Sequence, residues 1–252
     1  MILRRLSTNL RSQNWVAIGI EFLLVVLGVF FGIVAANWNE ERLEKRETAV
    51  LLTQLEEELS TFVNYIDSVG RYYESAGGYA DRAAAAWEGD RSISDADFVI
   101  AAYQASQING IANNAEVWGA IFGAENLRDI EDPVIRRNLG NVMTFDYALT
   151  DLRAVASRYR EEVRKTIPNR IQAAIREQCG DRQGPDGPVL PTRCVLGFAA
   201  EDWRTTAAAL RARPELLAEL QWHRAAIANQ MAQGRAIQES ARILVERIGP
   251  RR

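Results

Sequence analysis

A nearly uninterrupted apolar segment at residues 15–37 constrains the fold of this chain more than any other part of its sequence. Glu21 is its one charged residue. As an α-helix the segment extends about 33 Å at about 1.5 Å per residue, enough to cross a hydrocarbon core of about 30 Å. We therefore predict a transmembrane helix over residues 15–37, preceded by a tail at residues 1–14 and followed by the main domain at residues 38–252.

A cleaved signal peptide is the alternative interpretation of this segment. Arg4, Arg5 and Arg11 precede it, and the small residues 34–36 suit a signal peptidase. However, the apolar run exceeds the roughly 7 to 15 residues of an ordinary signal peptide, Glu21 interrupts it, and helix-forming sequence continues beyond it. These features favour an uncleaved anchor.

Five residues of the segment and its ends suggest how it contacts its surroundings. Gly28 and Gly32 form a GxxxG pair that would let a second membrane helix approach closely, although glycine is also common in membrane helices generally. Glu21 could meet a polar partner on that helix, lean towards the headgroups or stay protonated. Trp15 and Trp38 are placed like anchors at the two membrane interfaces.

Two motifs resemble a known family. Residues 19–28 read GIEFLLVVLG and residues 37–42 read NWNEER. They resemble the amino-terminal signature of a bacterial family of uncharacterised single-span membrane proteins. Residues 118–132, WGAIFGAENLRDIED, followed by Ile135-Arg136, are similar to a later pattern of that family, with Phe122 where a small polar residue is more usual. The resemblance covers under a third of the chain and implies an anchored helical domain without a known activity.

Charge and cysteine usage bear on location and partners. The chain has 252 residues and a net charge of −3, and residues 1–14 carry three arginines and no acid. Because the main domain is acidic, we predict no nucleic-acid partner. Cys179 and Cys194 bracket a Gly/Pro-rich loop, which favours a disulfide in an oxidising compartment over two unrelated reduced thiols. We expect a single-pass protein of the bacterial inner membrane with a cytoplasmic amino terminus and a periplasmic domain.

Helical periodicity dominates the rest of the chain. Apolar residues from Leu52 to Tyr73 recur every three or four positions, so we expect the anchor to continue as one long helix until Gly77-Gly78 interrupts it. Further helices are expected over residues 95–107, 114–122, 133–175 with a kink at Pro168, 201–211, and from Pro214 to Gly249. The predicted fold class is all-α: a transmembrane helix continuing into an antiparallel bundle of long helices.

The sequence offers no recognisable catalytic or metal-binding motif. His223 is the one histidine and lies on an apolar helical face, which is typical of a packed core residue. Glu219 could share that face, but two ligands do not make a metal site. Glycine-rich phosphate loops and GxSxG are absent. We predict no cofactor, no metal and no enzymatic activity. Trp118, Phe122, Trp222 and His223 could line a small-molecule pocket, although core packing explains them equally well.

Three functions remain in order of preference. The first is a membrane-anchored protein that acts through protein contacts, as a scaffold or accessory subunit of a membrane assembly or as a homo-oligomer. Its partners would be the lipid bilayer and another membrane protein or a second copy of itself. The second is a periplasmic bundle that senses a small ligand. The third is an enzyme whose site is not recognised.

Overall fold

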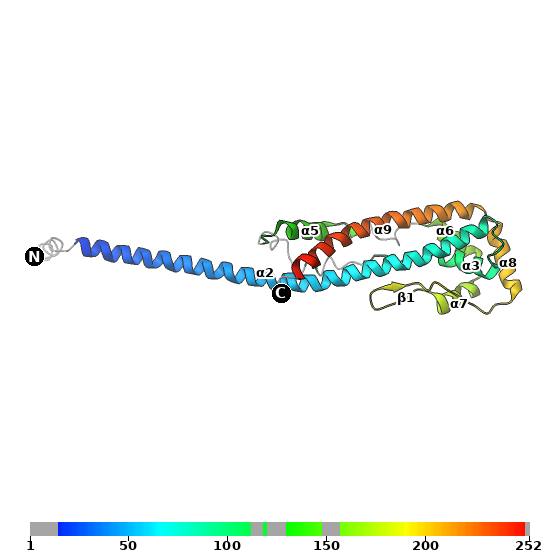
Figure 1. The fold of residues 1–252 in the computed structure, drawn as a ribbon, viewed down its shortest axis with the longest axis horizontal. Helices are drawn as coiled ribbons and strands as arrows, with labels where there is room; N and C mark the ends of the chain where they lie inside the picture. Colours follow the sequence, from blue (N-terminus) through cyan, green and yellow to red (C-terminus); the bar gives the residue numbers. More distant parts are fainter. Residues whose placement is uncertain (1–14, 112–117, 120–129, 148–156, 250–252) are drawn as a thin grey trace, which may run out of the picture. The chain divides into compact units, whose positions relative to one another are not determined.

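The computed structural model describes residues 15–111, 118–119, 130–147 and 157–249, which are mostly α-helical (Figure 1). The chain divides into two compact units, residues 1–51 and residues 52–252. The first unit contains the start of α2, a helix of 73 residues that runs from Trp15 to Trp87. The second unit is a helical bundle, which confirms the predicted all-α fold class.

The amino-terminal part of α2 is long and apolar enough to cross a membrane. From Ile20 to Val34 its large apolar side chains are exposed within the structure. The helix passes residue 38 without a break, which confirms the predicted continuation. The predicted interruption at Gly77-Gly78 is wrong: α2 continues to Trp87, and Tyr79, Ala80, Ala83 and Ala86 bury its last turns in the bundle. The turn after α2 contains Gly89 at φ +97°, a conformation that favours glycine.

The core of the bundle begins with the predicted apolar face of α2. Its members are all buried: Leu52, Leu55, Leu59, Phe62, Ile66, Val69 and Tyr73. The last helix, α9 (Glu215–Ile248), runs alongside this part of α2 in the opposite direction (Figure 1). Gln238 Nε2 joins the two helices by donating to the Val63 carbonyl at 3.0 Å and to Asp67 Oδ1 at 2.6 Å.

Capping residues set the starts of two shorter helices where the sequence predicts them. Ser94 Oγ accepts the amide of Asp97 at the start of α3 (Asp95–Gln104). Asp132 Oδ1 accepts the amide of Val134 at the start of α5 (Pro133–Thr144). The helix α8 (Ala200–Arg211) also matches its prediction. α3 packs against α8, and α5 packs against α9.

The long helix predicted over residues 133–175 is wrong. α5 ends at Thr144, α6 spans Arg158–Thr166, and α7 (Asn169–Cys179) follows Pro168 as a separate helix. Tyr159 and Val163 on α6 and Ile171 and Ile175 on α7 are buried, so the large apolar residues that suggested one helix still face the core from two. Most of the predicted helix over residues 114–122 lies outside the described residues; Trp118 and Gly119 are helical.

A short strand pair, which the sequence did not indicate, lies within the cysteine loop. β1 (Arg182–Gln183) pairs antiparallel with β2 (Pro188–Val189), with Arg182 opposite Val189. The predicted disulfide between Cys179 and Cys194 is confirmed.

Candidate functional site

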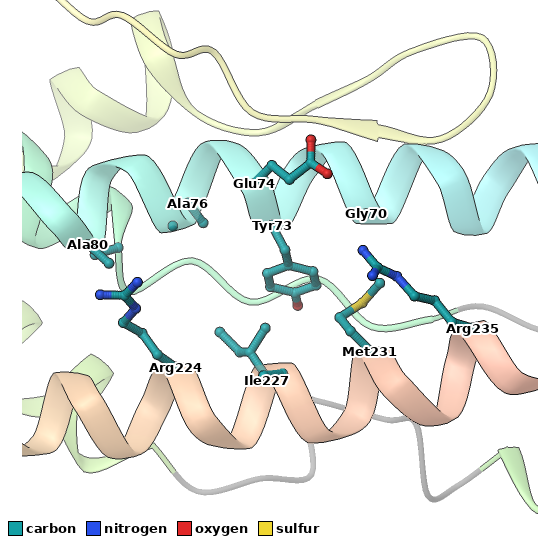
Figure 2. A pocket seen from close by; sticks show the side chains of 12 residues that line it. Gly70, Tyr73, Glu74, Ala76, Ala80, Arg224, Ile227, Met231 and Arg235 are labelled. Carbon is teal, nitrogen blue, oxygen red and sulfur yellow. The ribbon is translucent and has the colours of Figure 1, made fainter.

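A cleft of about 240 Å³ lies between α2 and α9 within the bundle. Figure 2 shows the Tyr73 ring, Ile227 and Met231 in its middle, with Arg224 towards one end and Arg235 towards the other. Arg224 is paired with Asp81 at 2.8 Å. The cleft therefore has an apolar middle, an ion-paired arginine at one end and a second arginine at the other, and Glu74 also lines it.

Small residues on α2 keep this cleft open. Ala76, Gly77 and Ala80 line it together with Gly70. A Cβ atom added at Gly70 or Gly77 would meet no neighbouring atom within 4 Å, so these glycines do not serve close helix packing.

A second candidate site is a group of three guanidinium groups, from Arg160 and Arg164 on α6 and Arg176 on α7, here called the arginine cluster. Arg160 Nη1 donates to the Ser106 carbonyl at 2.6 Å, and Arg164 Nη2 donates to Gln107 Oε1 at 2.9 Å. These contacts hold the chain just after α3. All of these acceptors are neutral.

Tyr103 brings the third arginine to the cluster. The Arg164 guanidinium lies over the Tyr103 ring, 4.7 Å from its centroid, and Arg176 Nη1 donates to the Tyr103 hydroxyl at 3.4 Å. In the described part of the chain, none of the three guanidinium groups has a carboxylate oxygen within 4.0 Å. Burial, together with the charges of Arg160 and Arg176, lowers the pKa of Arg164.

Tyr72 on α2 is a buried tyrosine whose hydroxyl has a shifted pKa. Burial raises the pKa of Tyr72 strongly, the Asp181 carboxylate raises it further, and Arg160 and Arg164 act in the opposite direction. Tyr72 is 1% exposed, and its hydroxyl has no hydrogen-bond partner among the residues that the structure describes. A buried hydroxyl without a partner is unfavourable and calls for an explanation.

His223 is buried on α9, as its position on an apolar helical face indicated. Its Nδ1 lies 2.8 Å from Ser157 Oγ, and its ring lies 5.7 Å from the Tyr159 ring. Ser157 Oγ also accepts the Arg160 amide at 3.1 Å, so it joins the start of α6 to the His223 ring. Burial, and secondarily the charge of Arg160, lowers the pKa of His223 to about 4.

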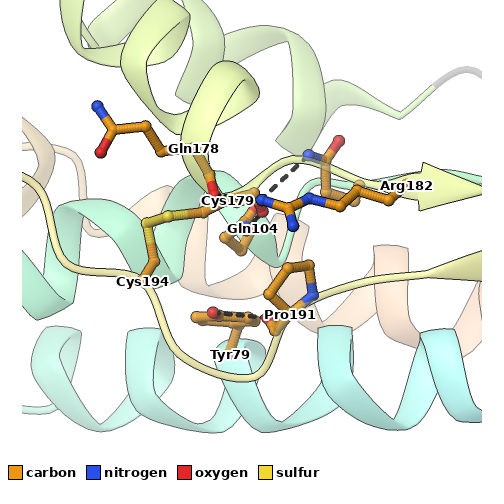
Figure 3. Close-up of a disulfide and its surroundings, with 8 residues drawn as sticks. Tyr79, Gln104, Gln178, Cys179, Arg182, Pro191 and Cys194 are labelled. Carbon is orange, nitrogen blue, oxygen red and sulfur yellow. Dashed lines mark hydrogen bonds between the residues drawn. A yellow bond between two sulfur atoms is a disulfide. The ribbon is translucent and has the colours of Figure 1, made fainter.

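The disulfide loop is held against α2 and α3 by hydrogen bonds to its backbone. Tyr79 donates to the Pro191 carbonyl at 2.8 Å and Gln104 Nε2 to the Cys179 carbonyl at 2.7 Å, as Figure 3 shows. Ser68 Oγ donates to the Pro188 carbonyl at 3.0 Å. A loop with little regular structure is thus fixed by distant helices.

The residues predicted to act in the membrane lie on the exposed part of α2. Glu21, Gly28 and Gly32 share one face of this helix, because they are separated by seven and four positions. Trp38 is 64% exposed, and Arg42 lies 5.8 Å from its ring centroid. Trp15 is helical. Their roles in the membrane stay predictions.

The predicted aromatic pocket residues have different surroundings. Trp118 is buried against Phe62, with ring centroids 5.0 Å apart. Trp222 is 53% exposed, His223 contacts Ser157, and Phe122 lies outside the described residues. The α2–α9 cleft described above is lined by other residues. Among the residues described, no group of three or more His, Cys, Asp or Glu side chains is placed to hold a metal ion.

Comparison with known proteins finds no matching family model, no matching curated protein and no matching solved structure. The resemblance to single-span bacterial membrane proteins therefore stays a prediction from two motifs. Sequence reasoning missed the arginine cluster. The spacing of Arg160 and Arg164 by four residues was a visible signal, but the approach of Arg176 and Tyr103 from other helices was not.

Proposed function

We propose that this protein is anchored in a bacterial inner membrane by one helix and acts through protein–protein contacts, as an accessory subunit, a scaffold or a homo-oligomer. One observation carries the proposal: α2 joins an exposed apolar segment to the buried core of a helical bundle without a break. Extraction of membranes with carbonate tests the anchor. The full chain should stay in the membrane pellet, and release into the supernatant would contradict the proposal.

The disulfide supports a periplasmic position for residues 38–252 and hence a cytoplasmic tail at residues 1–14. Protease added to spheroplasts tests this orientation. We expect the helical domain to be degraded from outside while an amino-terminal tag survives. Protection of the domain with loss of the tag would reverse the orientation.

The face formed by Glu21, Gly28 and Gly32 supports contact with a second membrane helix. Gly28→Cys and Gly32→Cys should form cross-linked products in oxidised membranes, whereas Phe30→Cys, on the opposite side of the helix, serves as the matched control. Equal cross-linking at all three positions would indicate random collision. A monomer without cross-links or a co-purifying partner would refute contact through this face.

A ligand-binding domain is the second candidate function, favoured by the apolar cleft between α2 and α9. A thermal-shift screen of small molecules on the full chain, repeated on Ala228→Trp to fill the cleft, tests it. A stabilising compound that loses its effect in the variant would favour this function over a purely structural one.

A further inference from the structure

We propose that the α2–α9 cleft binds a zwitterionic amino acid with an apolar side chain. This inference rests on the second candidate function, a ligand-binding domain, and names the chemical class of its ligand. The middle of the cleft holds the apolar side chain, Arg235 holds the carboxylate and Glu74 holds the ammonium group. The lining of the cleft, its volume and the charges at one end each support one part of this assignment.

The middle of the cleft presents apolar surface to a ligand. The Tyr73 ring lies there with Ile227 and Met231 (Figure 2). The Tyr73 hydroxyl is already engaged, because it donates to the Asn109 carbonyl at 2.6 Å and accepts the Asn109 amide at 2.9 Å. A polar ligand group placed here would lose its hydrogen bonds to water without replacement, so the cleft selects an apolar body.

The volume of the cleft matches the side chain of a large apolar amino acid. It is about 240 Å³, which holds about eight water-sized groups at about 30 Å³ each. An apolar cavity of about 150 Å³ is enough for benzene. A six-membered ring on a short chain, as in phenylalanine, therefore fits the cleft.

Opposite charges from the two walls meet one end of the cleft. Arg235 belongs to α9 and Glu74 to α2 (Figure 2). Among the residues that the structure describes, neither charged group forms an ion pair or a hydrogen bond, and the two lie more than 4.0 Å from each other. A guanidinium group pairs well with a carboxylate, and a carboxylate accepts hydrogen bonds from an ammonium group. An amino acid carries both complementary groups on one carbon atom, so it can pair with both walls.

The charged end of the cleft opens into a more polar groove, which fixes the direction of the ligand. The groove shares Gly70, Glu74 and Arg235 with the cleft as lining residues. The charged groups of the ligand therefore lie at the boundary between apolar and polar surface, while its side chain is buried. At the other end Arg224 is already paired with Asp81 at 2.8 Å.

Saturation-transfer difference NMR on the full, disulfide-bonded chain in lipid nanodiscs tests the proposal, with empty nanodiscs as the background. The probes are L-phenylalanine, phenylpropionate, which lacks the ammonium group, and phenylethylamine, which lacks the carboxylate. L-phenylalanine should bind at least about fivefold more tightly than either analogue, because each analogue loses one charged contact. Equal or tighter binding of an analogue would overturn the assignment.

Two variants connect each charge to its ligand group. Arg235→Gln should weaken binding of L-phenylalanine at least about fivefold but not that of phenylethylamine, which has no carboxylate. Glu74→Gln should weaken binding of L-phenylalanine but not that of phenylpropionate, which has no ammonium group. Arg136→Gln on α5 and Glu177→Gln on α7 make the same charge changes away from the cleft and should leave all affinities unchanged. Equal loss of affinity in all four variants would refute the assignment.

Ala228→Trp separates failure of this assignment from failure of the ligand-binding function, because it fills the cleft. If all three probes bind equally to the unchanged chain and Ala228→Trp weakens all of them, the cleft binds apolar ligands and the zwitterionic assignment is wrong. If none of the probes binds, the assignment is also wrong, and the wider compound screen still decides whether the domain binds another ligand.

Discussion

At the scale of single residues, His223 shows how burial selects a protonation state. His223 is 2% exposed, and its Nδ1 lies 2.8 Å from Ser157 Oγ. Charging the imidazole would bring a cation into the core beside Arg160. His223 is thus a neutral core residue at physiological pH.

Acidification should destabilise the bundle through His223. The unfolded histidine titrates near pH 6.5, whereas the folded one titrates at about 4. Between these two pH values His223 binds a proton in the unfolded state but not in the folded state. The contribution of His223 to the free energy of unfolding therefore falls by about 3 kcal/mol as the pH drops from 6.5 to 4. Urea unfolding at pH 7.5 and 4.5 measures this loss.

His223→Phe should remove that part of the pH dependence, because the phenyl ring packs but does not titrate. The free energy of unfolding of the variant is compared with that of the unchanged chain at both pH values. Carboxylates contribute equally to the pH dependence of both proteins, so the difference between the two isolates the effect of His223. An identical loss of stability on acidification would show that His223 does not titrate as expected.

At the scale of elements, substitution of two glycines on or beside α2 by alanine should change the stability of the protein in opposite directions. Gly77→Ala adds a methyl group that meets nothing within 4 Å in a helix interior, so it should stabilise by about 0.5–1 kcal/mol. Gly187→Ala should destabilise by about 1–3 kcal/mol, because φ is +142° and the new Cβ would lie 2.9 Å from the Tyr65 ring. Thermal unfolding of both variants checks the two signs; the same sign for both would contradict the geometry.

The disulfide should contribute about 3 kcal/mol by restricting the unfolded chain, since its cysteines lie 15 positions apart. Replacing both cysteines by serine should lower Tm accordingly. Dithiothreitol should have the same effect on the unchanged chain and none on the double variant. A reductant-sensitive double variant would point to another cause.

Local signals account for the elements that the sequence predicts correctly. Ser94, Asp132 and Pro214 each mark a helix start through capping or a fixed φ, which needs no distant contact. The break after α5 could not be predicted this way. Phe145 and Tyr147 leave the helix to pack with each other and, through Tyr147, with Trp118, a contact between segments far apart in sequence.

At the scale of the whole molecule, the two units should be separable. The apolar part of α2 belongs to the first unit, and its large side chains are exposed within the structure. A chain of residues 40–252 should therefore remain in solution without detergent and unfold cooperatively, with a Tm within about 3 °C of the full chain. Calorimetry of both proteins measures this. Loss of cooperative unfolding would show that the bundle depends on the anchor.

The limits of prediction differ between the anchor and the candidate sites. Residues 15–37 are recognisable because length and apolar composition are properties of one continuous segment. The arginine cluster and the cleft each require helices that are distant in sequence, so no local pattern contains them. His223 could be placed in the core from its spacing, but its Ser157 partner could not.

The cysteine loop also implies an order of assembly. The two sulfur atoms belong to residues 15 positions apart, whereas Tyr79 and Ser68 reach the loop across 112 and 120 positions. Closing the longer separation costs the unfolded chain about 2 kcal/mol more in entropy. The disulfide is therefore expected to form early in folding, as a local event. The closed loop then docks as a unit onto α2, which precedes it by about 100 residues in the chain.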